Sequence, residues 1–200
     1  WNELLESFKK ELEVDSDKFS VLQIPQLYKS CYGEKKYKDK LGEISYQFSQ
    51  AEPNVLHEKI RMIEPTHVVT TNFDNLIESE FEKSKNKYSL VVTDDEYRQE
   101  GSSHHLIIKM HGDFVHGNIV LTEEDFFDWR SNNPLLYSAI KTLIASHCLL
   151  FLGYGFNDQT LKNIINDIKH SKANKYKNWY YYPSNSINLD EKIILESWGL

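Results

Sequence analysis

Two short apolar runs, each ending in polar residues, constrain the fold of this chain more than any other feature. They are residues 68–74, Val-Val-Thr-Thr-Asn-Phe-Asp, and residues 106–113, Leu-Ile-Ile-Lys-Met-His-Gly-Asp. Such apolar, largely β-branched runs are typical of buried parallel strands. Open α/β sheets bind ligands in the crevice outside the carboxyl ends of their strands. If the two strands are near one another in the sheet, Asn72, Asp74 and His111 converge on one pocket.

Composition limits the class of protein. The 200 residues suit one domain, or one domain with a helical appendage, and 40% hydrophobic with 13% aromatic residues is enough for a core. The formal net charge of -7 argues against a generic nucleic-acid-binding or anionic-membrane surface, which needs a basic footprint. No apolar run approaches the length of a membrane span, and the N-terminus does not have the pattern of a signal peptide.

The two cysteines, Cys31 and Cys148, limit the metal and redox chemistry. Neither has a Cys-x-x-Cys partner, so a four-cysteine zinc site is excluded. His104, His105 and His116 have no spacing to other ligand types that supports a metal site, and we interpret them as loop and strand-edge residues. We therefore expect no metal, and the cysteine usage favours a reducing, cytoplasmic setting.

Residues 1–64 have the pattern of a helical module. Apolar residues recur at helical spacing from Trp1 to Leu12. Pro25 stands where a second helix would begin, and residues 33–50 have the pattern of another amphipathic helix. Pro53 opens a further short helix, so we expect no strand in this part of the chain.

From residue 65 onward, strands are expected to alternate with helices. The predicted strands are 67–71, 88–92, 105–110, 118–121, 148–152 and 178–182, and the predicted helices are 74–82, 134–146, 189–198 and those beginning near 122 and 158. Between them we expect a polar loop over 94–104. This alternation predicts an α/β fold with a mostly parallel sheet covered by helices on both faces. The chain then divides into a helical module, 1–64, and an α/β core, 65–200.

The segment Gly153-Tyr154-Gly155 lies between a predicted strand and a predicted helix. Its glycines would let the backbone approach a ligand, and the helix N-terminus would favour a phosphate or a ribose hydroxyl. The third glycine of the dinucleotide fingerprint is absent, because Asp158 stands there. A tight turn with Asp158 as the helix N-cap explains the segment at least as well.

The polar residues after the first two apolar runs also have two interpretations. His111 suits a general base at the end of a strand, and a structural histidine bonded to a loop is the alternative. Asn72 and Asp74 flank Phe73 in a strand-to-helix turn, where Asp74 could cap the helix and Asn72 could satisfy loop backbone. Together with His111 they look like a set that binds a ribose and positions water.

Four motifs occur in the order in which the prokaryotic sirtuin-like domain has them. They are residues 70–74, 109–113, 121–125 and 151–158. The chain resembles this family over essentially its whole length, and the family includes the NAD-cleaving effectors of bacterial anti-phage systems, such as the Thoeris effector and the defence-associated sirtuins. The resemblance implies a Rossmann-like NAD-binding core, a helical module inserted between its first and second strands, and hydrolysis of NAD to nicotinamide and ADP-ribose.

The resemblance also implies residue roles and partners. Asn72 and His111 match the catalytic asparagine and histidine of the family, Asp74 matches an acidic residue near the nicotinamide ribose, and residues 153–155 match the loop on the adenosine side. NAD is then the substrate, and a homo-oligomer with an accessory sensor domain or partner defence protein is expected. The expected NAD-binding residues are Thr71, Asp74, Gly112, Gly153, Tyr154 and Gly155.

Three departures from the family leave alternatives. The family's opening strand and glycine-rich phosphate loop do not occur in this sequence. The sequence stops at Leu200, where members of the family continue into another strand. Gly155 stands where relatives usually carry serine. This sequence is then either an excerpt of a longer protein or a polypeptide that is inactive alone, and we favour the excerpt. A non-catalytic NAD- or ADP-ribose-binding sensor or assembly module is the main alternative. An NAD-dependent protein deacetylase is disfavoured, because those enzymes typically carry a four-cysteine zinc module. An unrelated α/β domain would need four ordered motifs to occur by chance.

Overall fold

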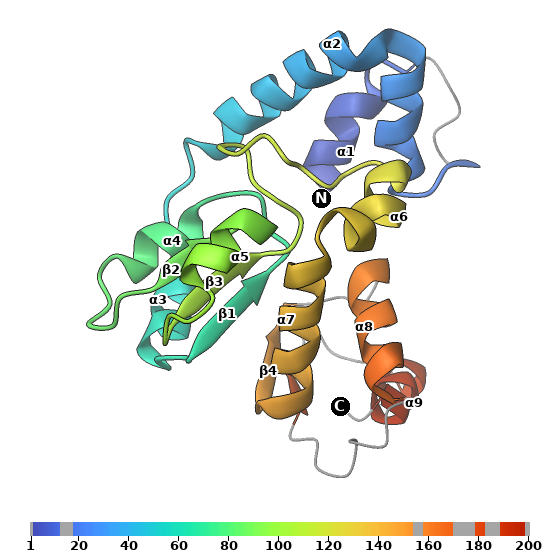
Figure 1. Ribbon diagram of the computed structural model, residues 1–200. Helices are drawn as coiled ribbons and strands as arrows, with labels where there is room; N and C mark the ends of the chain where they lie inside the picture. The colour runs from blue at the N-terminus through green and yellow to red at the C-terminus, as the bar shows by residue number, and fades with distance from the viewer. Residues whose placement is uncertain (1, 13–17, 154–157, 170–178, 183–188, 199–200) are drawn as a thin grey trace. The chain divides into compact units, whose positions relative to one another are not determined.

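A computed structural model describes residues 2–12, 18–153, 158–169, 179–182 and 189–198 (Figure 1). The chain divides into two compact units, Trp1–Asn132 and Asn133–Leu200. This division follows spatial contacts rather than helix and strand content, so the expected boundary between a helical module and an α/β core after residue 64 stays a prediction.

The first unit begins with helices, as the sequence predicts. They are α1 (Asn2–Lys9), α2 (Gln23–Phe48) and α3 (Val55–Met62). The two helices expected around Pro25 and over 33–50 run together as α2, but Gly33 interrupts them with φ 82° and ψ 166°. A positive φ of this size favours glycine, which has no Cβ to clash with the backbone, so Gly33 separates the two expected segments.

The helical stripe of α1 forms a core with α2. Leu4, Leu5 and Phe8 of α1 are buried together with Leu12, which follows the helix, and they share a cluster with Ile24, Tyr28, Tyr37 and Ile44 of α2. The ring of Phe8 lies 5.1 Å from that of Tyr28 in an edge-to-face arrangement. Phe73 and Leu121 belong to the same cluster, so this core extends to the turn that follows the first strand.

A three-stranded parallel sheet forms the other half of the first unit. Its strands are β1 (His67–Thr70), β2 (Ser89–Val91) and β3 (Leu106–Lys109), in the order β1-β3-β2. All four residues of the central strand β3 are buried, as expected for an apolar run covered on both faces. Helices lie on both sides of the sheet (Figure 1), so the expected α/β, Rossmann-like architecture is confirmed.

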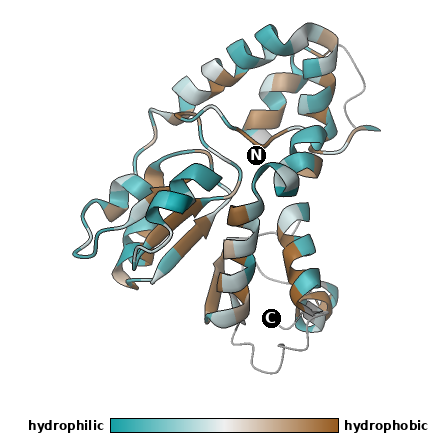
Figure 2. Ribbon diagram, in the orientation of Figure 1, coloured by the Kyte–Doolittle hydropathy of each residue, from teal (hydrophilic) through white to brown (hydrophobic). Residues whose placement is uncertain are grey.

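Helices α4 (Leu76–Phe81), α5 (Asp94–Glu100) and α6 (Glu123–Asn132) complete the first unit. The polar loop expected over 94–104 is wrong, because α5 begins there. Thr93 and Glu96 form a capping box, and the first turn of α5 is acidic, which the helix dipole favours. This helix is hydrophilic over most of its surface in Figure 2, so it gives no apolar stripe by which to predict it.

The strand expected over 118–121 is also wrong. These residues form no strand, and the backbone N–H of Val120 donates to the carbonyl of His111 at 2.9 Å. The apolar side chains of Val120 and Leu121 are buried because the segment folds back over the turn after β3. Burial, rather than strand pairing, explains their apolar character.

The second unit alternates helices and strands as expected. It contains α7 (Pro134–Ser146), β4 (Leu149–Leu152), α8 (Gln159–Lys169), β5 (Trp179–Tyr182) and α9 (Leu189–Trp198). Strands β4 and β5 pair in parallel from Leu149↔Trp179 to Leu152↔Tyr182. Within the described residues β4 has this one strand neighbour, so the central position expected for it stays a prediction.

Helices α7 and α8 pack against each other through apolar faces. Their buried aliphatic residues are Leu136, Ala139, Ile140, Ile144, Leu161, Ile164, Ile165 and Ile168. At the edge of this contact, the hydroxyl of Tyr137 donates to the Asp167 carboxylate at 2.7 Å. In the part of the chain that the structure describes, no helix has both the length and the apolar sequence that crossing a bilayer requires.

An ionic cluster around Glu11 reinforces the packing of the first helices. The Glu11 carboxylate accepts hydrogen bonds from Lys40 Nζ at 2.6 Å and from the Tyr28 hydroxyl at 2.8 Å, and Lys36 Nζ lies 3.1 Å away. The hydrogen bond from Lys40, followed by those from Tyr28 and Lys36, lowers the pKa of Glu11 from 4.5 to about 2. The Glu11 side chain is 34% exposed, so solvent screening weakens the stabilisation that these ionic contacts provide.

Replacing Glu11 with glutamine is expected to lower the free energy of unfolding at pH 7 by ~1 kcal/mol. The folded pKa lies below the unfolded one, so the carboxylate contributes fully above about pH 4.5 and loses its contribution as the pH falls towards 2. Urea unfolding should therefore show the difference between wild type and E11Q shrinking from pH 7 to pH 3. A constant difference would show that the charge of Glu11 is not its source.

Candidate functional site

The pairing of β1 with β3 brings the two predicted polar segments together. The strands are parallel, their register ends at Thr70↔Lys109, and the N–H of Met110 donates to the carbonyl of Thr70 at 2.9 Å. Asn72 and His111 each follow two residues after this last pair, so both come from the same carboxyl edge. Both apolar runs form strands as predicted, and they are neighbours in the sheet, which was the condition for their polar segments to come together.

Asn72 lies in an anchored turn between β1 and α4. Its backbone N–H donates to Thr70 Oγ1 at 3.1 Å, and its side chain is exposed. Phe73 is buried and its ring lies 5.9 Å from that of Phe114. The half-buried Asp74 carboxylate accepts from the N–H of Leu76 at 3.1 Å in a turn ahead of α4, but the N-cap of α4 is Asn75, so Asp74 is not itself the N-cap. The half-buried Thr71 precedes Asn72 in this turn.

His111 occupies the corresponding turn after β3, but it is covered. Its side chain is 1% exposed, and its ring lies 4.7 Å from the ring of Phe126 of α6 in an edge-to-face arrangement. A ligand therefore reaches the imidazole only after covering side chains shift. The structure thus combines an exposed Asn72 with a buried His111.

Gly112 is required by the shape of the turn that holds His111. Its φ is +75°, and a Cβ at this position would overlap the backbone carbonyl of Asn118 and lie 2.6 Å from the side-chain oxygen of Asn118. The same side-chain oxygen accepts from the N–H of Asp113 at 3.3 Å. Close packing of Asn118 against the turn therefore explains this glycine without a ligand.

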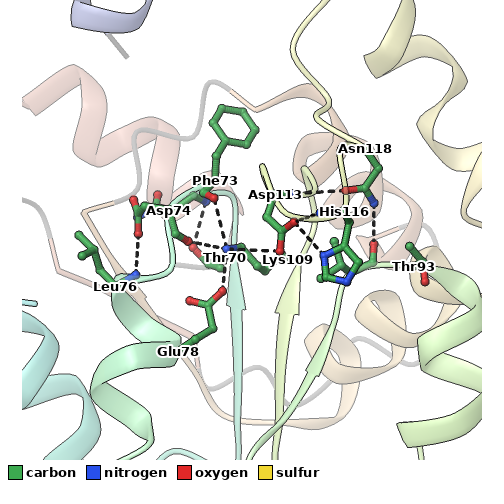
Figure 3. A network of polar contacts seen from close by, with 12 residues as sticks. Thr70, Phe73, Asp74, Leu76, Glu78, Thr93, Lys109, Asp113, His116 and Asn118 are labelled. Atoms are coloured by element: carbon green, nitrogen blue, oxygen red, sulfur yellow. Dashed lines mark hydrogen bonds and ion pairs between the residues drawn. The ribbon is translucent and has the colours of Figure 1, made fainter. Parts of the chain in front are cut away.

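A buried lysine joins the two turns (Figure 3). The Lys109 side chain is 1% exposed, and its ammonium lies 2.6 Å from Glu78 Oε1 and 4.0 Å from Asp113 Oδ2. It also donates to the carbonyl oxygens of Phe73, at 3.4 Å, and Asp74. Sequence reasoning missed this residue, although a lysine at the end of a buried strand is itself a signal, since lysine is almost never fully buried unless paired.

His116 links two acidic residues beside this network. Its Nδ1 lies 2.8 Å from Asp113 Oδ1 and its Nε2 lies 2.8 Å from Glu96 Oε1. Desolvation alone would lower the pKa of His116, but the hydrogen bond and charge of Asp113, with Glu96, outweigh it and raise the pKa above 6.5. His116 lies in a loop as expected, yet it is tied to the turn after β3.

The predicted adenosine-side residues belong to the second unit. Gly153 follows β4 with φ +61°, and a Cβ there would meet no atom within 4 Å. Tyr154 and Gly155 lie outside the described residues. Asp158 Oδ1 accepts from the N–H of Leu161 at 2.7 Å, so its expected role as an N-cap of the following helix is confirmed. Among the described residues, no group of three or more His, Cys, Asp or Glu side chains is arranged to hold a metal ion.

Comparison with known families identifies the domain. The SIR2-like domain family matches residues 66–200. The chain belongs to this family. The resemblance to prokaryotic sirtuin-like domains is thereby confirmed.

Curated relatives of this SIR2-like chain carry names from the same branch. Defense-associated sirtuin 2 of Bacillus subtilis is 29% identical over 98% of this chain and 20% of its own length. The NAD(+) hydrolase ThsA of Cytobacillus dafuensis is 25% identical over 91% of this chain and 37% of its own length. ThsA of Acinetobacter baumannii (strain 532279) is 25% identical over 90% and 38% respectively. The chain thus spans about a fifth to two fifths of these relatives.

Replacing Gly112 of this SIR2-like domain with alanine is expected to destabilise it strongly. Gly117 is a matched control, because its φ is +66° but its Cβ would meet nothing within 4 Å. We expect G117A to cost ~1 kcal/mol, from backbone strain alone, and G112A to cost a further ~1–3 kcal/mol from the overlap with Asn118. Urea unfolding of both variants tests this, and equal losses would contradict the overlap.

Replacing His116 with glutamine is expected to destabilise the domain more at pH 6 than at pH 9. The folded pKa of His116 is raised, so its charge contributes fully below the unfolded pKa of about 6.5 and is lost as the pH rises through the folded value. Urea midpoints of wild type and H116Q between pH 5.5 and 9 measure the effect. A difference that grows with pH would contradict the assigned ion pairs.

Proposed function

We propose that this SIR2-like domain hydrolyses NAD, cleaving the bond between nicotinamide and ribose to give nicotinamide and ADP-ribose. The observation that carries the proposal is the parallel pairing of β1 with β3, which brings the segments of Asn72 and His111 to one carboxyl edge. That edge is where α/β sheets bind ligands. The names of the ThsA relatives, NAD(+) hydrolases, support the same reaction.

The chemistry requires positioning more than acid catalysis. The bond from nicotinamide nitrogen to ribose C1′ breaks through an oxocarbenium-like transition state, as glycosidic bonds do. The bonding electron pair leaves with nicotinamide, which departs neutral because its ring nitrogen is cationic in NAD, so no general acid is needed. Water adds its oxygen to C1′ and releases a proton. Orientation of the reactants alone supplies up to roughly 7–11 kcal/mol.

Asn72 and His111 have distinct proposed roles. The exposed amide of Asn72 positions the ribose and the attacking water, and His111 acts on a ribose hydroxyl or on the water. Because His111 is buried under Phe126, NAD must displace covering side chains before the imidazole engages. Thr71 and Asp74 would contact NAD from the turn after β1, and Gly112 from the turn after β3.

One observation favours a second candidate, a non-catalytic module that binds NAD or ADP-ribose. His111 is buried, and its ring is packed against an aromatic side chain, as a structural histidine would be. Such a module would use the exposed Asn72 turn for binding without turnover. The deacetylase alternative has no comparable support, because Cys31 and Cys148 cannot form a four-cysteine zinc site.

The cellular role is part of the same proposal. The names of the relatives support a defence effector that depletes NAD in response to phage. From the family resemblance we also expect a cytoplasmic homo-oligomer controlled by an accessory sensor domain or a partner defence protein.

Replacing His111 or Asn72 with alanine is expected to lower NAD cleavage by at least ~100-fold, the usual scale for losing a positioned proton-transfer group. The protein with its natural flanking sequence is incubated with NAD, and nicotinamide and ADP-ribose are followed by chromatography. His105→Ala is the matched control, because His105 precedes β3 at the opposite end of the strand and is expected to leave turnover unchanged.

The outcomes separate the two candidates. Turnover retained in H111A would refute the catalytic role of His111. No turnover in wild type, with measurable NAD or ADP-ribose binding that N72A weakens, would favour the binding module. A protein that neither cleaves nor binds NAD would refute both.

A further inference from the structure

Lys109 has a full set of partners that span two separate turns. An ammonium has three N–H donors, and three acceptors surround this one: Glu78 Oε1 and the carbonyl oxygens of Phe73 and Asp74. Asp113 Oδ2, at 4.0 Å, adds charge from the other side. With its donors engaged and its side chain 1% exposed, Lys109 is not available to a substrate.

Stability of the strand does not explain a lysine here. The remaining residues of β3, Leu106, Ile107 and Ile108, are apolar and buried. Replacing a buried ion pair by well-packed apolar residues is often neutral or stabilising, because desolvating the charges is costly. The reason for a lysine is therefore better sought in what its donors hold.

Those donors hold the backbone immediately after Asn72. Phe73 and Asp74 are the next two residues, and both of their carbonyls point at the ammonium (Figure 3). Lys109 also lies two residues before His111 on the central strand. One side chain therefore connects the end of β3, which leads into the His111 turn, to the turn that carries Asn72, independently of the strand ladder, which ends at Thr70.

We propose that Lys109 is a positioning residue, which sets the placement of Asn72 relative to His111 by holding the turn 72–75 against β3. Its kinetic consequence rests on the proposed NAD cleavage, whereas its structural consequence does not. Lys109 touches no reacting atom, and it acts through the backbone of Phe73 and Asp74.

The test compares Lys109→Met with the double variant K109M/E78Q. K109M removes the donors to both carbonyls and leaves the Glu78 carboxylate without its cation, so it is expected to lower stability and turnover together. K109M/E78Q also removes the charge of Glu78, while Asp113 keeps His116 as a partner, and the double variant is expected to recover most of the urea midpoint. If Lys109 positions Asn72, kcat of the double variant stays ~100-fold below wild type, the scale for misplaced reacting groups, while KM changes only a few-fold.

Two controls isolate the carbonyl contacts. E78Q alone keeps Lys109 and its bonds to Phe73 and Asp74, so its kcat is expected to stay within a few-fold of wild type. R61M removes a different cation from a buried carboxylate, because Arg61 Nε lies 2.8 Å from Glu80 in α4, and it does not touch the turn 72–75. Its kcat should equal that of wild type even where its stability is lower.

Hydrogen exchange measured by mass spectrometry supplies a readout that does not depend on activity. Backbone amides of residues 71–75 are expected to exchange faster in K109M and in K109M/E78Q, and at the wild-type rate in R61M. Recovery of kcat together with stability in the double variant, or unchanged exchange of residues 71–75, would overturn the proposal. If wild-type protein does not cleave NAD, the proposed function fails, and the exchange rates alone decide whether Lys109 holds the turn.

Discussion

Parallel pairing of β1 with β3 is the interaction on which the candidate site depends. Parallel strands need a long crossover between them, and here α4, β2 and α5 supply it. The pairing brings Thr70 opposite Lys109, so residues nearly forty positions apart share one edge. Neither polar segment would form the candidate site without the other. The segment after β1 provides an exposed amide, and the segment after β3 provides an imidazole.

The charged side chains at this edge form a chain of ion pairs that runs from buried Lys109 to His116 and Glu96, which are more exposed. Lys109 is balanced by Glu78 and Asp113, and Asp113 in turn accepts from His116, which also meets Glu96. Satisfied networks of this kind rigidify their surroundings, and a missing member leaves an uncompensated buried charge. The turns that carry Asn72 and His111 therefore share their stability with residues that would never contact a ligand.

The sequence predicted this fold wherever burial leaves a periodic signal. Helix α7 was predictable at both ends because Pro134 opens it and its apolar stripe is regular. Strand β3 was predictable because all its residues are buried. Helix α5 escaped prediction because it is polar over most of its surface, although its Thr93–Glu96 capping box was present. The contacts of Lys109 could not be predicted, because its partners are set by strand register rather than by local pattern.

Whether a ligand can reach His111 decides between the two proposed functions of this domain, catalysis and binding without turnover. The type of residue after β3 follows from the sequence motif, whereas its burial, with the ring of Phe126 of α6 4.7 Å away, is a property of the fold. The side chains that bury the imidazole of His111 shield it from water. They are compatible with NAD cleavage only if NAD binding moves them. If they stay in place, the domain binds NAD without cleaving it. The two proposed functions therefore differ in whether NAD binding uncovers His111, rather than in the identity of the residues at the strand ends.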